Sequence, residues 1–248
     1  MNIINKTKEI LFNGSISDDK LIIVDLNFSY KPTVRTSHLI ETGWSKAIVE
    51  MKRDNRKFYN APLVRCEKVI LEKDTIRIRV SSGITYKDVI GLRANQFETF
   101  IDFGKNETPN ALSVMNIVIT ADNFILIRWR HEGDWEGSYE VAGGFMKPDN
   151  PHDSFGNART HLFRDYGFSR VDIKEHKLFS IVYFPQISET MQMFILRLNL
   201  SKKDILKKDM TYDKIHFLST NIEEYRKFKE TESIHLPSEL ILNHYFDL

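Results

Sequence analysis

The chain has 248 residues, 42% of them hydrophobic and 28% charged, which is the composition of a folded globular protein and not of a disordered one. This length is enough for one large domain or two small ones. Lysine and arginine together number 35 against 34 acidic residues, so the charge balance selects no partner and lacks the basic excess of a general nucleic-acid binder.

The cysteine content and the hydropathy pattern indicate the compartment in which we expect the protein. Cys66 is the single cysteine, which excludes an internal disulfide framework and a zinc site built on cysteines. A single cysteine is typical of a reducing compartment, and we expect a cytoplasmic protein. The N-terminal residues lack the apolar core of a signal peptide, and no apolar run approaches the roughly 18 residues of a membrane span. We therefore expect no membrane partner and no general nucleic-acid partner.

Residues 1–108 are predicted to form a small α+β module. Its expected elements, in chain order, are a strand at residues 20–30, a helix at 38–52 capped by Ser37, and a hairpin of strands at 63–71 and 75–80. A polar stretch at residues 102–112 is broken by Gly104 and Pro109. It is predicted to link this module to a second domain at residues 109–248.

The second domain is predicted to place strands on both sides of one central helix. It opens with a hairpin of strands at residues 113–120 and 124–129, and the second strand ends at Arg128, Trp129 and Arg130. The elements expected after the central helix are strands at 177–184, 190–200 and 214–218, a short helix capped by Ser201, and helices at 222–229 and 236–245. This order of elements predicts the α+β class.

The central helix is predicted within residues 140–168, which read as a strand end, a glycine turn, a loop and a helix. Asn150 suits the N-cap, and Pro151 suits the first helical position, where its missing N–H costs nothing. The apolar residues at helical spacing, expected to form a buried stripe, are Phe155, Ala158, Leu162 and Tyr166. Gly167 suits the position after the helix, where a positive φ is needed.

This stretch resembles the Nudix box, whose pattern is Gly-x5-Glu-x7-Arg-Glu-apolar-x-Glu-Glu-x-Gly-apolar in a strand–loop–helix–loop. When the last glycine of the pattern is placed on Gly167, Thr160 falls on its arginine and His161 on its first helix glutamate. Arg164 and Asp165 then fall on the Glu-Glu pair. The shape of the box is therefore present, whereas most of its glutamates are replaced.

The other end of the box also departs from the pattern. When the first glycine is placed on Gly144, the early glutamate falls on Asn150, and the distance from Gly144 to Gly167 is two residues longer than in the family. The resemblance implies a Nudix-like α/β/α sandwich with a mixed sheet, preceded by the small α+β module. Residues 58–93 resemble the N-terminal module of the branch of UDP-sugar hydrolases.

Nudix enzymes hydrolyse pyrophosphates with divalent ions, and Mg²⁺ prefers hard oxygen ligands. The resemblance makes Asp165 and His161 the candidate catalytic residues, and Asp165 and Glu140 the candidate ligands of Mg²⁺, if a metal binds. Arg164 instead brings a fixed positive charge to the position of the ion. Two like charges about 4 Å apart, at an effective dielectric near 20, repel by roughly 4 kcal/mol.

In place of a metal, Arg164 could pair directly with a phosphate, which guanidinium groups bind well. Arg128 and Arg130, with His161 beside them, could complete an anion pocket, and the backbone of Gly143 and Gly144 could cradle a phosphate. The alternative readings stay open at this point. They are a surface arginine beside Asp165, a helix-face histidine without a special role, and glycines that serve only the turn.

Three functions follow from this pattern. The first is a Nudix-fold protein that recognises a phosphorylated, nucleotide-like small molecule, a nucleoside diphosphate derivative such as a nucleotide sugar, with hydrolysis weak or lost and with no required cofactor. The second is an active pyrophosphohydrolase that uses Mg²⁺ at a rebuilt carboxylate site. The third is an interaction module that kept the fold and lost the site.

Overall fold

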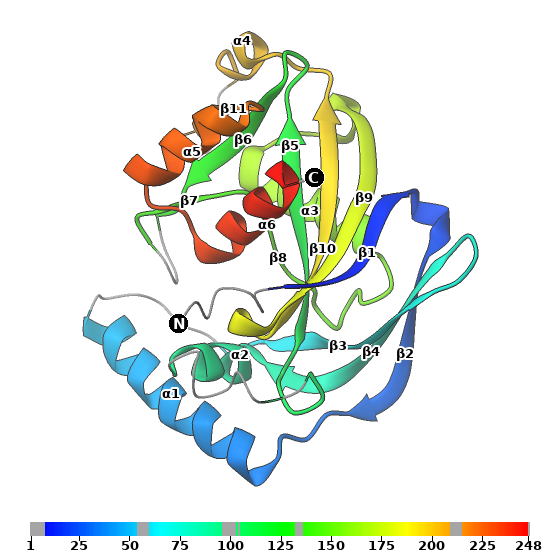
Figure 1. The fold of residues 1–248 in the computed structure, drawn as a ribbon, viewed down its shortest axis with the longest axis vertical. Coiled ribbons are helices and arrows are strands. Elements are labelled where there is room, and N and C mark those ends of the chain that lie inside the picture. The colour runs from blue at the N-terminus through cyan, green and yellow to red at the C-terminus, as the bar shows by residue number, and fades with distance from the viewer. Residues whose placement is uncertain are drawn as a thin grey trace. The chain divides into compact units, whose positions relative to one another are not determined.

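The computed structural model describes residues 8–53, 60–95, 103, 105–131, 136–208 and 215–247. The chain divides into two compact units, which are drawn in Figure 1. Unit 1 consists of Met1–Ser113, Phe145–Ser154 and Ser180–Gln192, and unit 2 consists of Val114–Gly144, Phe155–Phe179 and Met193–Leu248. The predicted domain boundary between residues 108 and 109 stays a prediction.

Unit 1 combines a mixed sheet with two helices. Its elements are β1 (Glu9–Ile16), a 3₁₀ turn η2 (Asp18–Lys20), β2 (Leu21–Ser29), α1 (Val34–Arg53), β3 (Pro62–Leu71), β4 (Ile76–Thr85) and α2 (Tyr86–Arg93). Strand β4 pairs antiparallel with β3 and parallel with β2, so the pairing in this unit is mixed, whereas a mixed sheet was predicted for the second domain. The predicted strand at 20–30 and the predicted hairpin are present, whereas β1 and α2 are additional elements.

The first helix begins earlier than predicted. It starts at Val34 and not at residue 38, because Thr33 Oγ1 accepts the N–H of Thr36 at 3.2 Å, so Ser37 lies inside the helix. Helices α1 and α2 approach closely at a pair of glycines. A Cβ at Gly43 would lie 1.8 Å from the carbonyl oxygen of Gly91, so only glycine fits at this crossing.

The described part of the predicted linker at 102–112 is not a linker, and residues 102 and 104 lie outside the described residues. Thr108 and Asn110 are buried, and Ala111 already begins strand β5 (Ala111–Ile119). Arg65 donates hydrogen bonds to the carbonyl oxygens of Lys105 at 2.8 Å and of Thr108 at 3.3 Å. Asn106 and Glu107 are exposed, whereas the polar residues Thr108 and Asn110 are buried, so the composition of this stretch does not mark a solvent-exposed linker.

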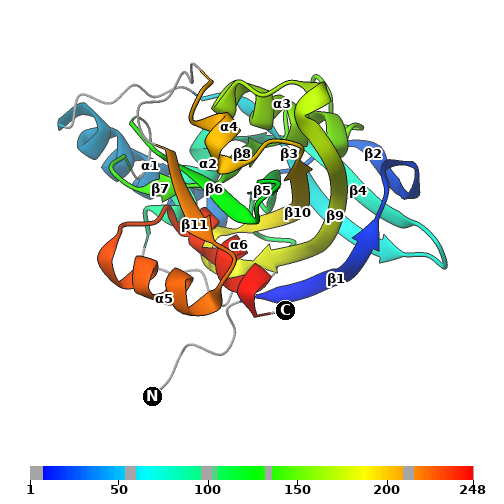
Figure 2. The same ribbon diagram turned by 90° about the horizontal axis from the view of Figure 1, so that it is seen from above.

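Unit 2 places helices on both faces of its strands. Its further elements are β6 (Phe124–Trp129), β7 (Tyr139–Glu140), β8 (Ala142–Phe145), α3 (Ser154–Tyr166), η4 (Arg170–Asp172), β9 (Ile173–Phe184), β10 (Glu189–Leu198), α4 (Lys202–Ile205), β11 (Ile215–Ser219), α5 (Ile222–Thr231) and α6 (Leu236–Phe246), with η5 (Pro185–Ile187) between β9 and β10 in unit 1. Helix α3 lies on one face of the unit 2 strands and α6 on the other, as Figures 1 and 2 show. The predicted α+β class and helix–sheet–helix layering are confirmed.

The predicted buried stripe of α3 is confirmed, and its predicted start is wrong. Leu162 and Tyr166 pack with Val118, Leu126 and Leu196 in one core cluster. The helix begins at Ser154, because the chain first makes a turn in which the N–H of Asn150 bonds to the carbonyl of Lys147 at 3.3 Å. Gly167 has φ of +67° and its N–H bonds to the carbonyl of Phe163, as expected for the residue after a helix.

None of the helices in the described ranges combines the length and the hydropathy needed to cross a membrane.

Candidate functional site

The alternation of strand β6 sorts its last residues onto two faces. Trp129 lies on one face, with its ring centroid 4.9 Å from that of Tyr139 on β7. Arg128 lies on the other face and is directly opposite Glu140 in the antiparallel pairing of β6 with β7. Arg130, two residues further, also reaches Glu140. The sequence Arg-Trp-Arg thus brings both arginines to one carboxylate.

Glu140 is almost buried, with 6% of its side chain exposed, and it is held by cations. Arg128 Nη2 lies 2.5 Å from Glu140 Oε1, and Arg130 Nη1 forms an ion pair with Glu140 Oε2. A carboxylate at this depth requires such partners, because burial removes it from water.

Helix α3 supplies the second carboxylate of the site. Its apolar stripe is fixed against β6, where the Tyr166 hydroxyl donates to the carbonyl of Leu126 at 3.1 Å. This packing turns Asp165 inward, so its side chain is completely buried. Asp165 Oδ1 lies 2.6 Å from Arg164 Nε and 3.4 Å from Arg128 Nη2. Arg128 therefore contacts both carboxylates.

The two glycines of the turn allow the backbone to approach this cluster. The carbonyl oxygen of Gly143 accepts a hydrogen bond from Arg164 Nη2 at 3.4 Å. A Cβ at Gly143 would lie 2.4 Å from Met115 Sδ, and one at Gly144 would lie 2.6 Å from His161 Cε1. Neither position has room for a side chain, so both glycines are needed where the strand passes the helix.

All the residues singled out from the sequence belong to unit 2, and the structure joins them in two groups. The ion pairs and the carbonyl contact join Arg128, Arg130, Glu140, Gly143, Arg164 and Asp165. His161 instead lies against Gly144 and is nearly buried. Among the described residues, three guanidinium groups of the first group face two carboxylates. We name these five charged side chains the arginine cluster.

Sequence reasoning missed two residues beside this cluster. His235 Nδ1 lies 3.9 Å from Glu140 Oε2 and 3.1 Å from the Ser238 hydroxyl, which accepts the N–H of Val141. His235 and Ser238 lie near the cluster because the N–H of His235 bonds to the carbonyl of Tyr139 at 2.8 Å, which holds this segment beside β7. No local sequence pattern predicts this pairing of His235 with Tyr139, which are nearly one hundred residues apart.

The arrangement does not fit a divalent ion. No group of three or more His, Cys, Asp or Glu side chains that could hold a metal occurs among the described residues. The facing oxygens of Glu140 and Asp165 are turned to guanidinium nitrogens, and a metal ion needs that same position. Other carboxylates are also engaged, since Glu189 of unit 1 is paired with Arg93 and Glu175 with Lys177.

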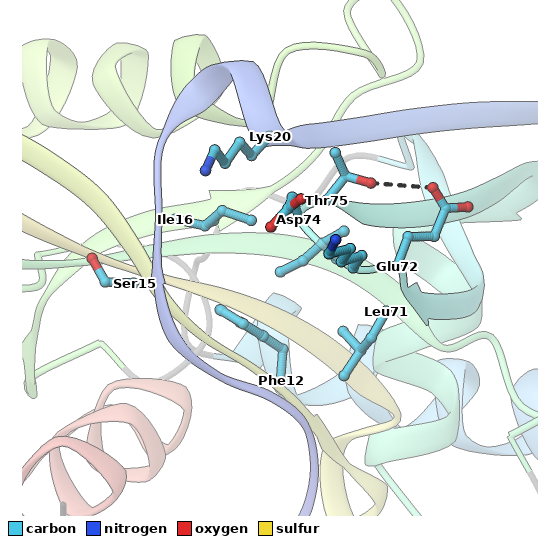
Figure 3. A pocket seen from close by; sticks show the side chains of 10 residues that line it. Phe12, Ser15, Ile16, Lys20, Leu71, Glu72, Asp74 and Thr75 are labelled. Atoms are coloured by element: carbon cyan, nitrogen blue, oxygen red, sulfur yellow. Dashed lines mark hydrogen bonds between the residues drawn. The ribbon is translucent and has the colours of Figure 1, made fainter.

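A hollow of about 320 Å³ lies in unit 1, between β1 and the turn of the β3–β4 hairpin. Figure 3 shows Phe12 and Leu71 on its apolar side and Lys20 and Asp74 on its polar side, with Glu72 accepting a hydrogen bond from Thr75. None of the candidate residues from the sequence lines this hollow. The candidate residues therefore lie elsewhere, in unit 2.

No protein-family model and no curated protein matches the sequence. Solved structures that match include the bifunctional NMN adenylyltransferase/ADP ribose pyrophosphatase of Francisella tularensis, with 13% identity over 65% of this chain and 48% of that chain, at a TM-score of 0.39. A Nudix hydrolase from Nitrosomonas europaea matches with 17% identity over 51% of this chain and 77% of that one, at a TM-score of 0.34. A MutT structure, from a study of the Aliivibrio salmonicida and Vibrio cholerae proteins, matches with 12% identity over 56% of this chain and 98% of that one, at 0.39.

The second and third of these structures are named as a Nudix hydrolase and a MutT protein. The chain spans less than half the length of the Francisella enzyme. At identities below 25% and TM-scores below 0.5, the matches assign neither an activity nor a ligand to this chain.

Proposed function

We propose that the chain is a Nudix-fold protein that binds the phosphates of a nucleoside diphosphate derivative, such as a nucleotide sugar, at the arginine cluster. Binding requires no divalent ion, and pyrophosphate hydrolysis is weak or lost. The observation that carries the proposal is the convergence of three guanidinium groups on Glu140 and Asp165, with more than half of the Arg164 side chain exposed.

A guanidinium group suits this task because it carries five N–H donors in one plane. An arginine that already holds a carboxylate therefore keeps the capacity to bind a phosphate oxygen. Arg164 is the most accessible of the three, with 54% of its side chain exposed, while Asp165 fixes its Nε. It is the arginine we expect to contact the ligand, beside the backbone of Gly143.

Weak or absent hydrolysis follows from the state of the carboxylates. Activation of water in pyrophosphate hydrolysis depends on a metal ion or on an available base. Asp165 is completely buried and pairs with Arg164, and Glu140 pairs with Arg128 and Arg130. Neither carboxylate faces solvent as a base would.

An active metal-dependent hydrolase is the second candidate, favoured by the convergence of Glu140 and Asp165 on one arginine. It requires the arginines to move when Mg²⁺ arrives. Release of phosphate or nucleoside monophosphate that depends on Mg²⁺ and falls in Asp165→Asn would support it. Turnover unchanged in Asp165→Asn would exclude this mechanism.

The proposal is tested by calorimetry across a nucleotide panel that contains ADP, ADP-ribose and UDP-glucose. We expect at least one ligand to bind, and Arg164→Ala to weaken it by about 10-fold to 100-fold, because a hydrogen bond to a charged group contributes roughly 1.5–3 kcal/mol.

The matched control for this titration is Arg197→Ala. Arg197 is also part-exposed in unit 2 and also pairs through Nε with a carboxylate, that of Glu175. We expect this variant to bind as the wild type does. Absence of binding across the panel would contradict the proposal. It would favour the third function, an interaction module that kept the fold and lost the site.

A further inference from the structure

Two buried carboxylates from different elements converge on a single nitrogen atom in unit 2. Glu140 comes from β7 and Asp165 from the end of α3, and Arg128 Nη2 lies 2.5 Å from the first and 3.4 Å from the second. The guanidinium is itself mostly buried, with 13% of the Arg128 side chain exposed. Arg128 thus lies between the two acids, whereas Arg130 and Arg164 each reach one of them.

Such a pair of acids needs a positive charge between them. Burial removes both carboxylates from water, and two negative charges repel each other. Removing one partner from a buried ion pair is strongly destabilising, because it leaves a buried charge without compensation. Arg128 is therefore the group on which the charge balance of both acids depends, because it is the one arginine of the cluster that contacts both.

A divalent ion would have to take the same position. Mg²⁺ binds carboxylate oxygens at about 2.1 Å and Ca²⁺ at about 2.3–2.6 Å, so an ion shared by Glu140 and Asp165 would lie where the nitrogen now lies. The ion and the guanidinium also repel each other. Asp165 Oδ2 is buried and has no hydrogen-bond partner among the described residues, which adds an oxygen available to a cation if the guanidinium were removed.

We propose that Arg128 is a resident cation, which occupies the position between Glu140 and Asp165 that a divalent ion would need and thereby makes the wild-type protein unable to bind one there. Removal of the Arg128 guanidinium converts this position into a divalent-cation site. The inference deepens the metal independence of the proposed function, and its test uses no nucleotide, so the two can fail separately.

The test is a titration with Mn²⁺ alone, followed by the loss of the free-ion signal in electron paramagnetic resonance. The wild type is expected to bind no Mn²⁺ at this site, and its melting temperature is expected to stay unchanged when Mn²⁺ is added. Arg128→Met, which keeps the length of the side chain, is expected to bind Mn²⁺ and to melt at a higher temperature in its presence.

Two further variants make the result specific. Arg128→Met combined with Glu140→Gln is expected to lose the Mn²⁺ signal again, and Arg197→Met is expected to behave as the wild type. A wild-type Mn²⁺ site that disappears in Asp165→Asn would overturn the proposal. A folded Arg128→Met protein that binds no Mn²⁺ would overturn it as well. If Arg128→Met does not fold, the wild-type titration still decides whether the position is closed to metal.

Discussion

Arg65 of unit 1 and the arginine cluster of unit 2 pair with carboxylates in different ways. In unit 1, Arg65 is 2% exposed, pairs with Glu67, donates to the carbonyls of Lys105 and Thr108, and stacks on the ring of Tyr30 at 4.4 Å. In unit 2, the acids of the arginine cluster are the buried members, and its arginines lie nearer to solvent.

The contrast separates an arginine that holds a fold from one that is suited to a ligand. One carboxylate neutralises the charge of Arg65, and backbone carbonyls accept hydrogen bonds from its other nitrogen atoms. In the arginine cluster, by contrast, three guanidinium groups share two carboxylates among the described residues, and Arg164 is more than half exposed. The presence of an ion pair is common to both regions, so it does not identify a functional arginine. The exposure of Arg164 is the feature that fits the proposed contact with a ligand.

The largest expected effect tests the structural side of this contrast. Arg65→Met leaves the half-buried Glu67 without its cation and removes the buried guanidinium that donates to the carbonyls of Lys105 and Thr108. We expect the free energy of unfolding in urea to fall by roughly 3–5 kcal/mol. Arg226→Met, which removes an exposed pair with Glu223, is the control and should have no measurable effect. A loss below about 1 kcal/mol for Arg65→Met would remove the distinction between the two regions.

A smaller effect is expected at His176, a half-buried side chain that can take up a proton. His176 packs against the rings of Phe155 and Phe194, and neither ring nitrogen has a hydrogen-bond partner among the described residues. Burial, with a contribution from the positive charge of Arg159, lowers the pKa of His176 to about 3. In contrast to Arg65, His176 is therefore neutral in the folded protein.

The sign of the pH effect follows from this lowered pKa. Below a pH of about 6.5, His176 binds a proton in the unfolded chain but not in the folded protein. The contribution of His176 to the free energy of unfolding is therefore fully present above that pH. It is lost as the pH falls toward 3, by about 1.4 kcal/mol per pH unit at most. His176→Phe should remove this part of the slope, measured by urea unfolding at pH 7 and pH 5. An unchanged slope would contradict the lowered pKa.

Local sequence patterns predicted most of the elements. The stripe of α3 was readable because Phe155, Leu162 and Tyr166 recur at the period of a helix, and the strand that ends at Arg128 and Trp129 was readable from its apolar run. The start of α3 was misplaced because Pro151, which suits a first helical turn, serves the preceding loop just as well.

The remaining errors share a cause, which is contact between distant parts of the sequence. Residues 105–110 have the composition of a linker, and contacts with residues at least forty positions away, such as Arg65 and Ser188, hold them in the fold. His235 reaches Glu140 through a pairing with β7 that no local signal encodes. The candidate site was thus predictable where one strand and one helix carry it, and not where the C-terminal segment completes it.

The central claim is that guanidinium groups replace a metal in binding phosphate. The most direct measurement is the dissociation constant of the tightest ligand of the nucleotide panel, determined by calorimetry for the wild-type protein once with EDTA and once with Mg²⁺. We predict the same constant in both conditions, because Arg128 closes the metal position and Arg164 contacts the phosphate. Binding that appears only with Mg²⁺ would contradict the account.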